Sequence, residues 1–159
     1  MTEPLDYEVQ LDVLSEGYDR ETEWFQPRIG IIPPATAVLT MTKARLWGSD
    51  IFTALHDMRS DDLGLTWSAP KANATVDRRR IGDFEVCPCD LTPAWHEATG
   101  KLLATGHTAV YQAGERGGLM GNNQVPRHVA YTVYDEASRS WSEWRTLELP
   151  DPDRFFWAS

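Results

Sequence analysis

The chain has 159 residues, with 15 Lys and Arg against 24 Asp and Glu, which gives a formal charge of −9. We expect no nucleic-acid partner, because phosphate contacts need clustered Lys and Arg, and the one basic run, residues 78–80, lies between Asp77 and Asp83. We also expect no membrane segment, because Gly, Pro and Thr interrupt the longest apolar stretches well short of the ~20 residues that a spanning helix needs.

The first residues and the cysteines bear on the cell compartment and on metal binding. Residues 1–6 are acidic where a secretory signal has a basic start and an apolar core, so we expect a cytoplasmic protein. Cys87 and Cys89 are separated by one residue, a spacing that favours two buried thiols over a zinc site or a disulfide. The histidines show no metal-type spacing, and we expect neither a metal nor a cofactor.

The composition favours short strands over helices, with seven Trp, ten Pro and eleven Gly spread along the chain. Residues 7–14 alternate apolar and polar side chains, which predicts a half-exposed N-terminal strand. A polar loop at residues 60–66 runs into Trp67 and stops at Pro70. Between these two segments, turn residues bound predicted strands at residues 28–32, 37–42 and 51–59.

The same pattern recurs in the second half of the chain. Turn signals there bound predicted strands at residues 84–95, 101–111, 127–134 and 141–147. A Gly-rich surface loop at residues 112–126 and a tight loop at residues 135–140, which ends in Trp141, connect them. Two four-stranded units, each closed by a polar turn that runs into Trp, predict an all-β fold with radial repetition, as in β-propeller blades.

The loop before Trp67 carries a specific motif. Residues 60–67 read Ser-Asp-Asp-Leu-Gly-Leu-Thr-Trp and match the Asp-box, Ser-x-Asp-x-Gly-x-Thr-Trp, at every defined position. Ser60 and Asp62 are suited to bind backbone N–H groups inside the turn, Gly64 to adopt a positive φ, and Trp67 to pack as an anchor. The box is therefore interpreted as a structural turn, and residues 134–141 are a degenerate counterpart of it.

With this motif the chain resembles the sialidase (neuraminidase) superfamily with BNR or Asp-box repeats, in particular bacterial proteins of the exo-α-sialidase type. The resemblance implies a partial six-bladed β-propeller in one incomplete domain, residues 1–159. Blade one would cover about residues 24–72 and blade two about residues 80–150, with an N-terminal strand before them.

The resemblance also implies a function and a ligand. Sialidases release terminal sialic acids from glycoconjugates, so the expected partner is a sialic acid-containing glycan or a similar acidic sugar. Two alternatives stay open: a non-catalytic glycan-binding or scaffold propeller, and a truncated product without independent activity. Open blade edges also predict self-association.

Four residues are candidates for the site that the resemblance implies. Arg28, in an Arg-Ile pair, corresponds to the first of three arginines that grip the substrate carboxylate. Asp50 corresponds to the acid/base, with Asp57 as the other candidate. His107 and Trp47 are expected to contact the sugar, and weaker candidates for the rim of the site are Asp90 and Arg127.

Each of these residues also has a structural interpretation, as a salt-bridge arginine, a turn carboxylate, a core histidine or a packing aromatic. The nucleophilic tyrosine of the family and its other two arginines belong to later blades, so those roles are assigned to no residue of this sequence.

Overall fold

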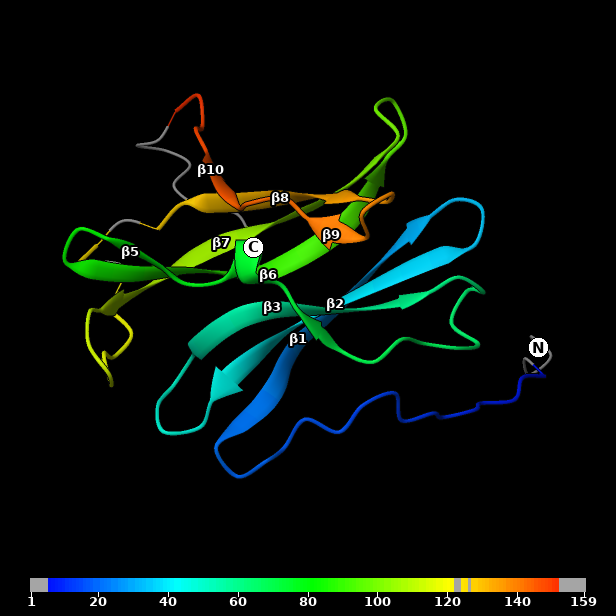
Figure 1. Ribbon diagram of the computed structural model, residues 1–159, viewed down its shortest axis with the longest axis horizontal. Coiled ribbons are helices and arrows are strands. Elements are labelled where there is room, and N and C mark those ends of the chain that lie inside the picture. The colour runs from blue at the N-terminus through cyan, green and yellow to red at the C-terminus, as the bar shows by residue number, and fades with distance from the viewer. Residues whose placement is uncertain (1–5, 122–123, 126, 152–159) are drawn as a thin grey trace, which may run out of the picture.

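The computed structural model describes residues 6–121, 124–125 and 127–151, and it is all-β apart from one short 3₁₀ turn (Figure 1). The first sheet has the strand order β1-β2-β3-β4, and its members are β1 (Thr22–Ile32), β2 (Thr36–Arg45), β3 (Ile51–Ser60) and β4 (Lys71–Ala72). All pairings in it are antiparallel. The 3₁₀ turn η1 (Ala74–Val76) connects it to the second sheet.

The second sheet is also antiparallel and has the order β10-β8-β7-β6-β5, with one more short strand paired to β8. Its members are β5 (Arg79–Ile81), β6 (Phe84–His96), β7 (Lys101–Gln112), β8 (Val129–Asp135), β9 (Ser140–Trp141) and β10 (Arg145–Leu147). This sheet has six strands where the sequence predicts four, because β5 was not predicted and the predicted strand at residues 141–147 is divided into β9 and β10. No helix among the described residues is long and apolar enough to cross a membrane.

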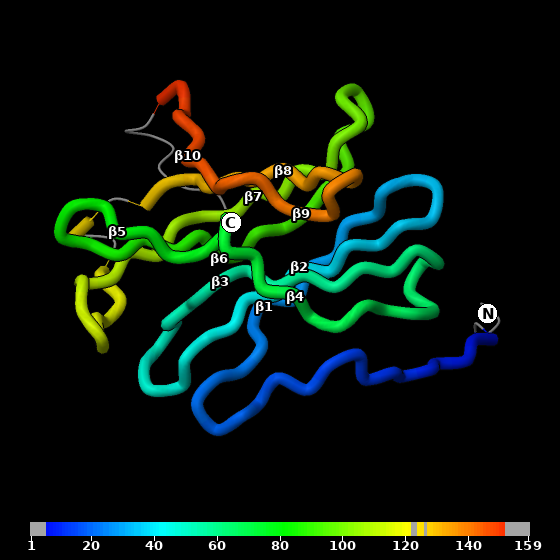
Figure 2. Tube along the Cα trace, in the orientation of Figure 1, coloured from blue at the N-terminus to red at the C-terminus, as the bar shows by residue number. Residues whose placement is uncertain are grey.

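The two sheets pack face to face, and Figure 2 shows them as two layers. One cluster joins Ile32, Val38 and Leu55 of the first sheet to Leu102, Tyr134 and Trp141 of the second. A second cluster joins Ile51 and Phe52 to Cys87, Cys89 and Tyr111. Burial of apolar area between the layers is the main force that holds them together.

The two sheets share two local features. Strands β1 and β6 each contain a bulge with one positive-φ residue, Gln26 at 54° and Asp90 at 53°. After β3 and after β8, a serine makes two hydrogen bonds with one residue of the strand. The Ser68 hydroxyl accepts the Arg59 N–H, and the Ser68 N–H donates to the Arg59 carbonyl. Ser142 makes the same two bonds with Val133. Trp67 and Trp141, which precede these serines, therefore occupy corresponding positions.

The Asp-box forms the turn that its residue types predict. Ser60 Oγ accepts the Gly64 N–H at 2.7 Å, and Asp62 accepts the Thr66 N–H at 2.9 Å and its hydroxyl at 2.6 Å. Gly64 has φ +98°, and the Trp67 indole donates to its carbonyl at 3.0 Å. Hydrogen bonds from Thr66 and Ser60 lower the pKa of the Asp62 carboxyl to about 2.

The predicted N-terminal strand is wrong. Residues 6–19 form no strand, and the apolar side chains of residues 7–14 lie in solvent, with Leu11 90% exposed. The segment runs outside both layers in Figure 2. Alternation gives a segment one apolar face, but a strand also needs a neighbour for its backbone hydrogen bonds, and no described strand lies beside this one.

Candidate functional site

A pocket of about 290 Å³ lies where the β2–β3 connection, the bulges of β1 and β6, and β7 meet. Two candidates from the sequence, Asp50 and His107, line it together, and the weaker candidates Asp90 and Arg127 line it as well. Its full lining is Gln26, Asp50, Phe52, Asp90, His107, Ala109, Leu119 and Arg127. We call it the bulge pocket.

Unusual backbone geometry marks this pocket. Gln26, Asp50 and Asp90 have φ of 54°, 54° and 53°, in the left-handed region that side chains other than glycine rarely adopt. The described residues include six non-glycine positions with positive φ, and half of them line this one pocket. Such strain costs of order 1–3 kcal/mol per residue and concentrates at functional sites, because it aims side chains that regular strands would point elsewhere.

Hydrogen bonds hold the strained positions. The Asp90 N–H donates to the Gln26 side-chain carbonyl at 3.0 Å, so the two bulges contact each other. The buried Tyr111 hydroxyl donates to the Asp50 carbonyl at 2.6 Å and accepts the Phe52 N–H at 3.1 Å, which fixes the backbone around Asp50. The Asp50 carboxylate itself is exposed and accepts the Ser49 hydroxyl at 3.0 Å.

Arg28 lies beside the bulge pocket and contacts it through Asp90. Its Nη2 is 3.1 Å from Asp90 Oδ1, and its Nη1 donates to the Pro27 carbonyl at 3.1 Å. The Thr40 hydroxyl donates to the Leu91 carbonyl at 3.0 Å, next to Asp90, and ties the first sheet to the β6 bulge. The ion-pair role that the sequence leaves open for Arg28 is therefore present in the structure.

His107 is a buried imidazole in a charged setting. Burial, as the largest cause, lowers its pKa, and the carboxylates of Asp90 and Asp50 oppose that shift while Arg127 adds to it. A pKa below the ordinary value keeps the ring neutral at pH 7, so one ring nitrogen can donate and the other can accept.

Asp57, the other acid candidate, lies outside the bulge pocket. Its carboxylate is buried between the sheets and accepts the Asn73 amide at 2.6 Å. Burial raises the pKa of this carboxyl, and its position in the core keeps it from any sugar bound at the surface.

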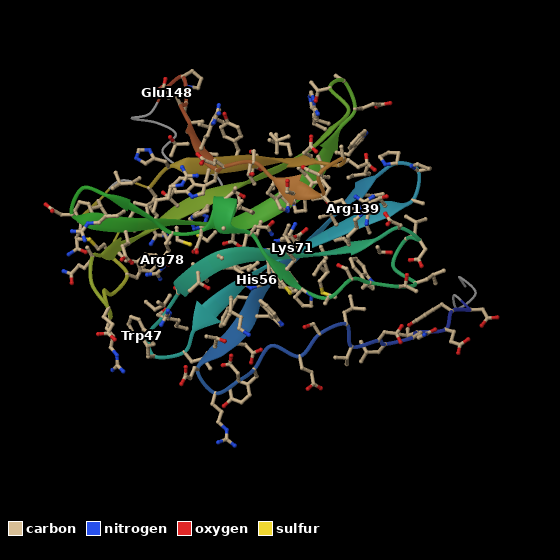
Figure 3. The ribbon with its side chains drawn as sticks, viewed as in Figure 1. Trp47, His56, Lys71, Arg78, Arg139 and Glu148 are labelled. Carbon is tan, nitrogen blue, oxygen red and sulfur yellow. The ribbon has the colours of Figure 1, made fainter. Side chains whose placement is uncertain are left out.

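Trp47 does not line the bulge pocket. Its ring is 40% exposed and lines a separate pocket of about 400 Å³. Figure 3 shows it on the β2–β3 connection at one end of the molecule, away from Lys71 and Arg139. The sequence places Trp47 beside Asp50 along the chain, but the turn between them gives their side chains different pockets.

The described residues contain no group of three His, Cys, Asp or Glu side chains arranged to hold a metal ion. Cys87 and Cys89 are buried free thiols, as the sequence predicts. Burial raises the pKa of Cys89 to about 12, so this thiol is protonated and inert at neutral pH.

Gln26 and Tyr111 are the site residues that sequence reasoning missed. One supports the β6 bulge and the other supports Asp50, and neither role leaves a local motif, because both depend on contacts more than 55 residues away along the chain. No protein-family model matches this chain, and no curated protein sequence is similar to it.

Proposed function

We propose that the bulge pocket binds an acidic sugar as part of a sialidase-like site, in which Asp50 is the acid that protonates the glycosidic oxygen. The observation that carries the proposal is the convergence of Asp50, Asp90, His107 and Arg127 on one pocket with strained, hydrogen-bonded backbone. In this proposal the two sheets are the first two blades of a six-bladed propeller, and their repeated bulge and closing Trp-Ser pair support it.

The chemistry of the lining suits this ligand. Guanidinium groups bind carboxylates through a planar, permanently charged fork, and Arg127 brings such a group to the pocket lining, while Arg28 at its edge is paired with Asp90. The neutral His107 and the carboxylate of Asp90 match the mixed donor and acceptor character of sugar hydroxyls. Asp50, exposed in this pocket, is the carboxyl group proposed to give its proton to the glycosidic oxygen.

Glycan binding without turnover is the second candidate, and one observation favours it. Sialidases use a tyrosine nucleophile, and the tyrosine nearest Asp50 is Tyr111, which is buried and bonded to the backbone on both sides. Burial raises the pKa of its hydroxyl far above neutrality, so Tyr111 is a supporting residue and not a nucleophile. In this second candidate the described residues supply binding and the acid, but no nucleophile for the covalent step.

The test measures binding and turnover separately. N-acetylneuraminic acid titrated into ¹⁵N-labelled chain should shift the amide resonances of Asp50, Asp90 and His107, and an Arg127→Ala variant should bind at least fivefold more weakly. Methyl galactoside, a smaller sugar without a carboxylate, is the ligand control. Equal shifts with both sugars, or shifts confined to other residues, would overturn the proposal.

Turnover then separates the two candidates. We expect no hydrolysis of a fluorogenic sialoside by this chain, and an Asp50→Asn variant should keep its affinity for the free sugar. Hydrolysis that Asp50→Asn abolishes would instead make the chain an enzyme in its own right.

A further inference from the structure

The larger pocket, of about 400 Å³, is separate from the bulge pocket and has a distinct chemistry. Three arginines, two glutamates and one exposed tryptophan line it, namely Arg20, Arg45, Arg116, Glu21, Glu115 and Trp47. We call it the arginine pocket. Its charged groups sum to +1 in a chain whose formal charge is −9.

The three guanidinium groups are available to a ligand. In the part of the chain that the structure describes, no hydrogen bond or ion pair engages the side chain of Arg20, Arg45 or Arg116. In contrast, the arginines at residues 28, 59, 78, 79 and 139 all have carboxylate partners. Free guanidinium groups gathered around one hollow favour an anionic ligand, because each one offers a fork to a carboxylate.

One wall of the arginine pocket is held rigidly. Asp19 accepts the Thr22 N–H at 2.6 Å, the Thr22 hydroxyl at 2.7 Å and the Glu21 N–H at 3.0 Å, which fixes the turn that carries Arg20. The Leu46 N–H donates to the Glu21 carbonyl at 2.9 Å and joins this turn to the chain between Arg45 and Trp47. A preformed wall lowers the conformational entropy that a ligand loses on binding.

Trp47 indicates that the anion is carried on a ring. Its side chain is 40% exposed and lines the pocket, and pockets for small ligands combine such apolar rings with a few polar groups that fix orientation. An acidic sugar has both features, a ring face to stack on the indole and a carboxylate for the arginines.

The two pockets lie close enough for one glycan to occupy both. Trp47 and Asp50 lie on the same connection, three residues apart and thus at most about 11 Å between Cα atoms. The β7–β8 connection likewise gives Arg116 to one pocket and Leu119 to the other. In Figure 1 these two connections lie beside each other at the same end of the molecule.

We infer that the arginine pocket is a second subsite, which holds an acidic sugar adjacent to the one in the bulge pocket. This inference rests on the proposed function and names its ligand class further, as a glycan with two neighbouring acidic sugars. The bulge pocket holds the terminal sugar, and the arginine pocket holds the carboxylate and ring of the next one.

The test compares a disaccharide of two sialic acids with the monosaccharide by calorimetric titration into the full chain. We expect at least tenfold tighter binding of the disaccharide, since each charge-assisted contact is worth about a factor of ten. Arg45→Ala and Arg116→Ala should each remove most of that gain and leave monosaccharide affinity within twofold. Arg145→Ala removes the same charge from β10, outside both pockets, and should change neither affinity.

The outcomes separate the two ideas. If the monosaccharide binds and the disaccharide gains nothing, or if Arg145→Ala matches Arg45→Ala, the second subsite is wrong and the bulge pocket stands. If the monosaccharide does not bind, the proposed function fails. In that case, a disaccharide affinity that depends on Arg45 and Arg116 would support the arginine pocket as a ligand site. If the disaccharide does not bind either, the arginine pocket is overturned as well.

Discussion

At the scale of single residues, Asp57 shows how a buried charge affects the stability of this fold. The carboxylate lies between the sheets with the Asn73 amide as its side-chain partner at 2.6 Å. Burial raises the pKa of Asp57 above the 3.8 of the unfolded chain, so the folded state holds the proton more tightly. Stability is therefore lost as the pH rises from 3.8 through the folded pKa, and the loss persists at neutral pH.

Asp57→Asn should raise the melting temperature at pH 7, because it removes the charge and keeps an oxygen that accepts the Asn73 amide. At pH 3, where the wild-type carboxyl is already protonated, the two proteins should melt together. Asp83→Asn, at an exposed position, is the matched control and should change neither value. A melting temperature at pH 7 that is lower for Asp57→Asn than for wild type, with equal values at pH 3, would contradict this account.

The family resemblance assigned Asp50 to the acid and His107 to a sugar contact, and the structure places both residues on the lining of one pocket, while their roles stay predictions. The bulges at Gln26 and Asp90 were not predicted, because any residue type can occupy a bulge and only the pairing with the next strand reveals it. Trp47 was expected to contact the sugar as an aromatic ring, but residue type does not fix the direction of a side chain in a turn, and Trp47 lines the other pocket.

At the scale of elements, the Asp-box and the strands show that local patterns succeed where the chemistry is local. The box is a closed set of contacts within eight residues, so its sequence was sufficient to predict its turn. The alternation in residues 7–14 was as clear as in any strand, but pairing is a contact between distant segments, and the described chain supplies no partner. Alternation therefore predicts which face a strand would bury, and not that a strand forms.

Gly64→Val should destabilise the first sheet far more than Asp61→Ala. Gly64 has φ +98°, where a β-branched residue is strained by about 1–3 kcal/mol. Asp61 makes ion pairs with Arg59 at 2.7 Å and Arg139 at 3.5 Å at the surface, where solvent screening leaves such pairs little effect on stability. Urea unfolding monitored by Trp fluorescence measures both changes, and equal midpoint shifts for the two variants would refute the structural role of the turn.

At the scale of the whole molecule, the strand order leaves edges whose lengths differ greatly. The first sheet ends at β1 on one side and at the two-residue β4 on the other, and the second sheet ends at β5 and β10, of three residues each. Short edges protect a sheet from pairing with other chains, and long ones invite it. The eleven residues of β1 therefore form a long open edge, and on the other sheet β5 covers only residues 84–86 of the thirteen-residue β6.

We expect the chain to self-associate through β1. Its bulge interrupts the strand between Phe25 and Arg28, so the longer of the two regular parts of the edge is residues 28–32, which includes the exposed Ile29 and Ile31. Ile31→Lys places a charge on this edge, where it opposes both desolvation and pairing, and it should shift the protein toward the monomer in sedimentation velocity. Leu65→Lys changes a side chain that is 86% exposed in the Asp-box turn, away from any edge, and should leave the distribution as in wild type. A wild-type chain that stays monomeric at all concentrations, or equal effects of the two variants, would show that the open edge of β1 is already protected by its bulge and twist.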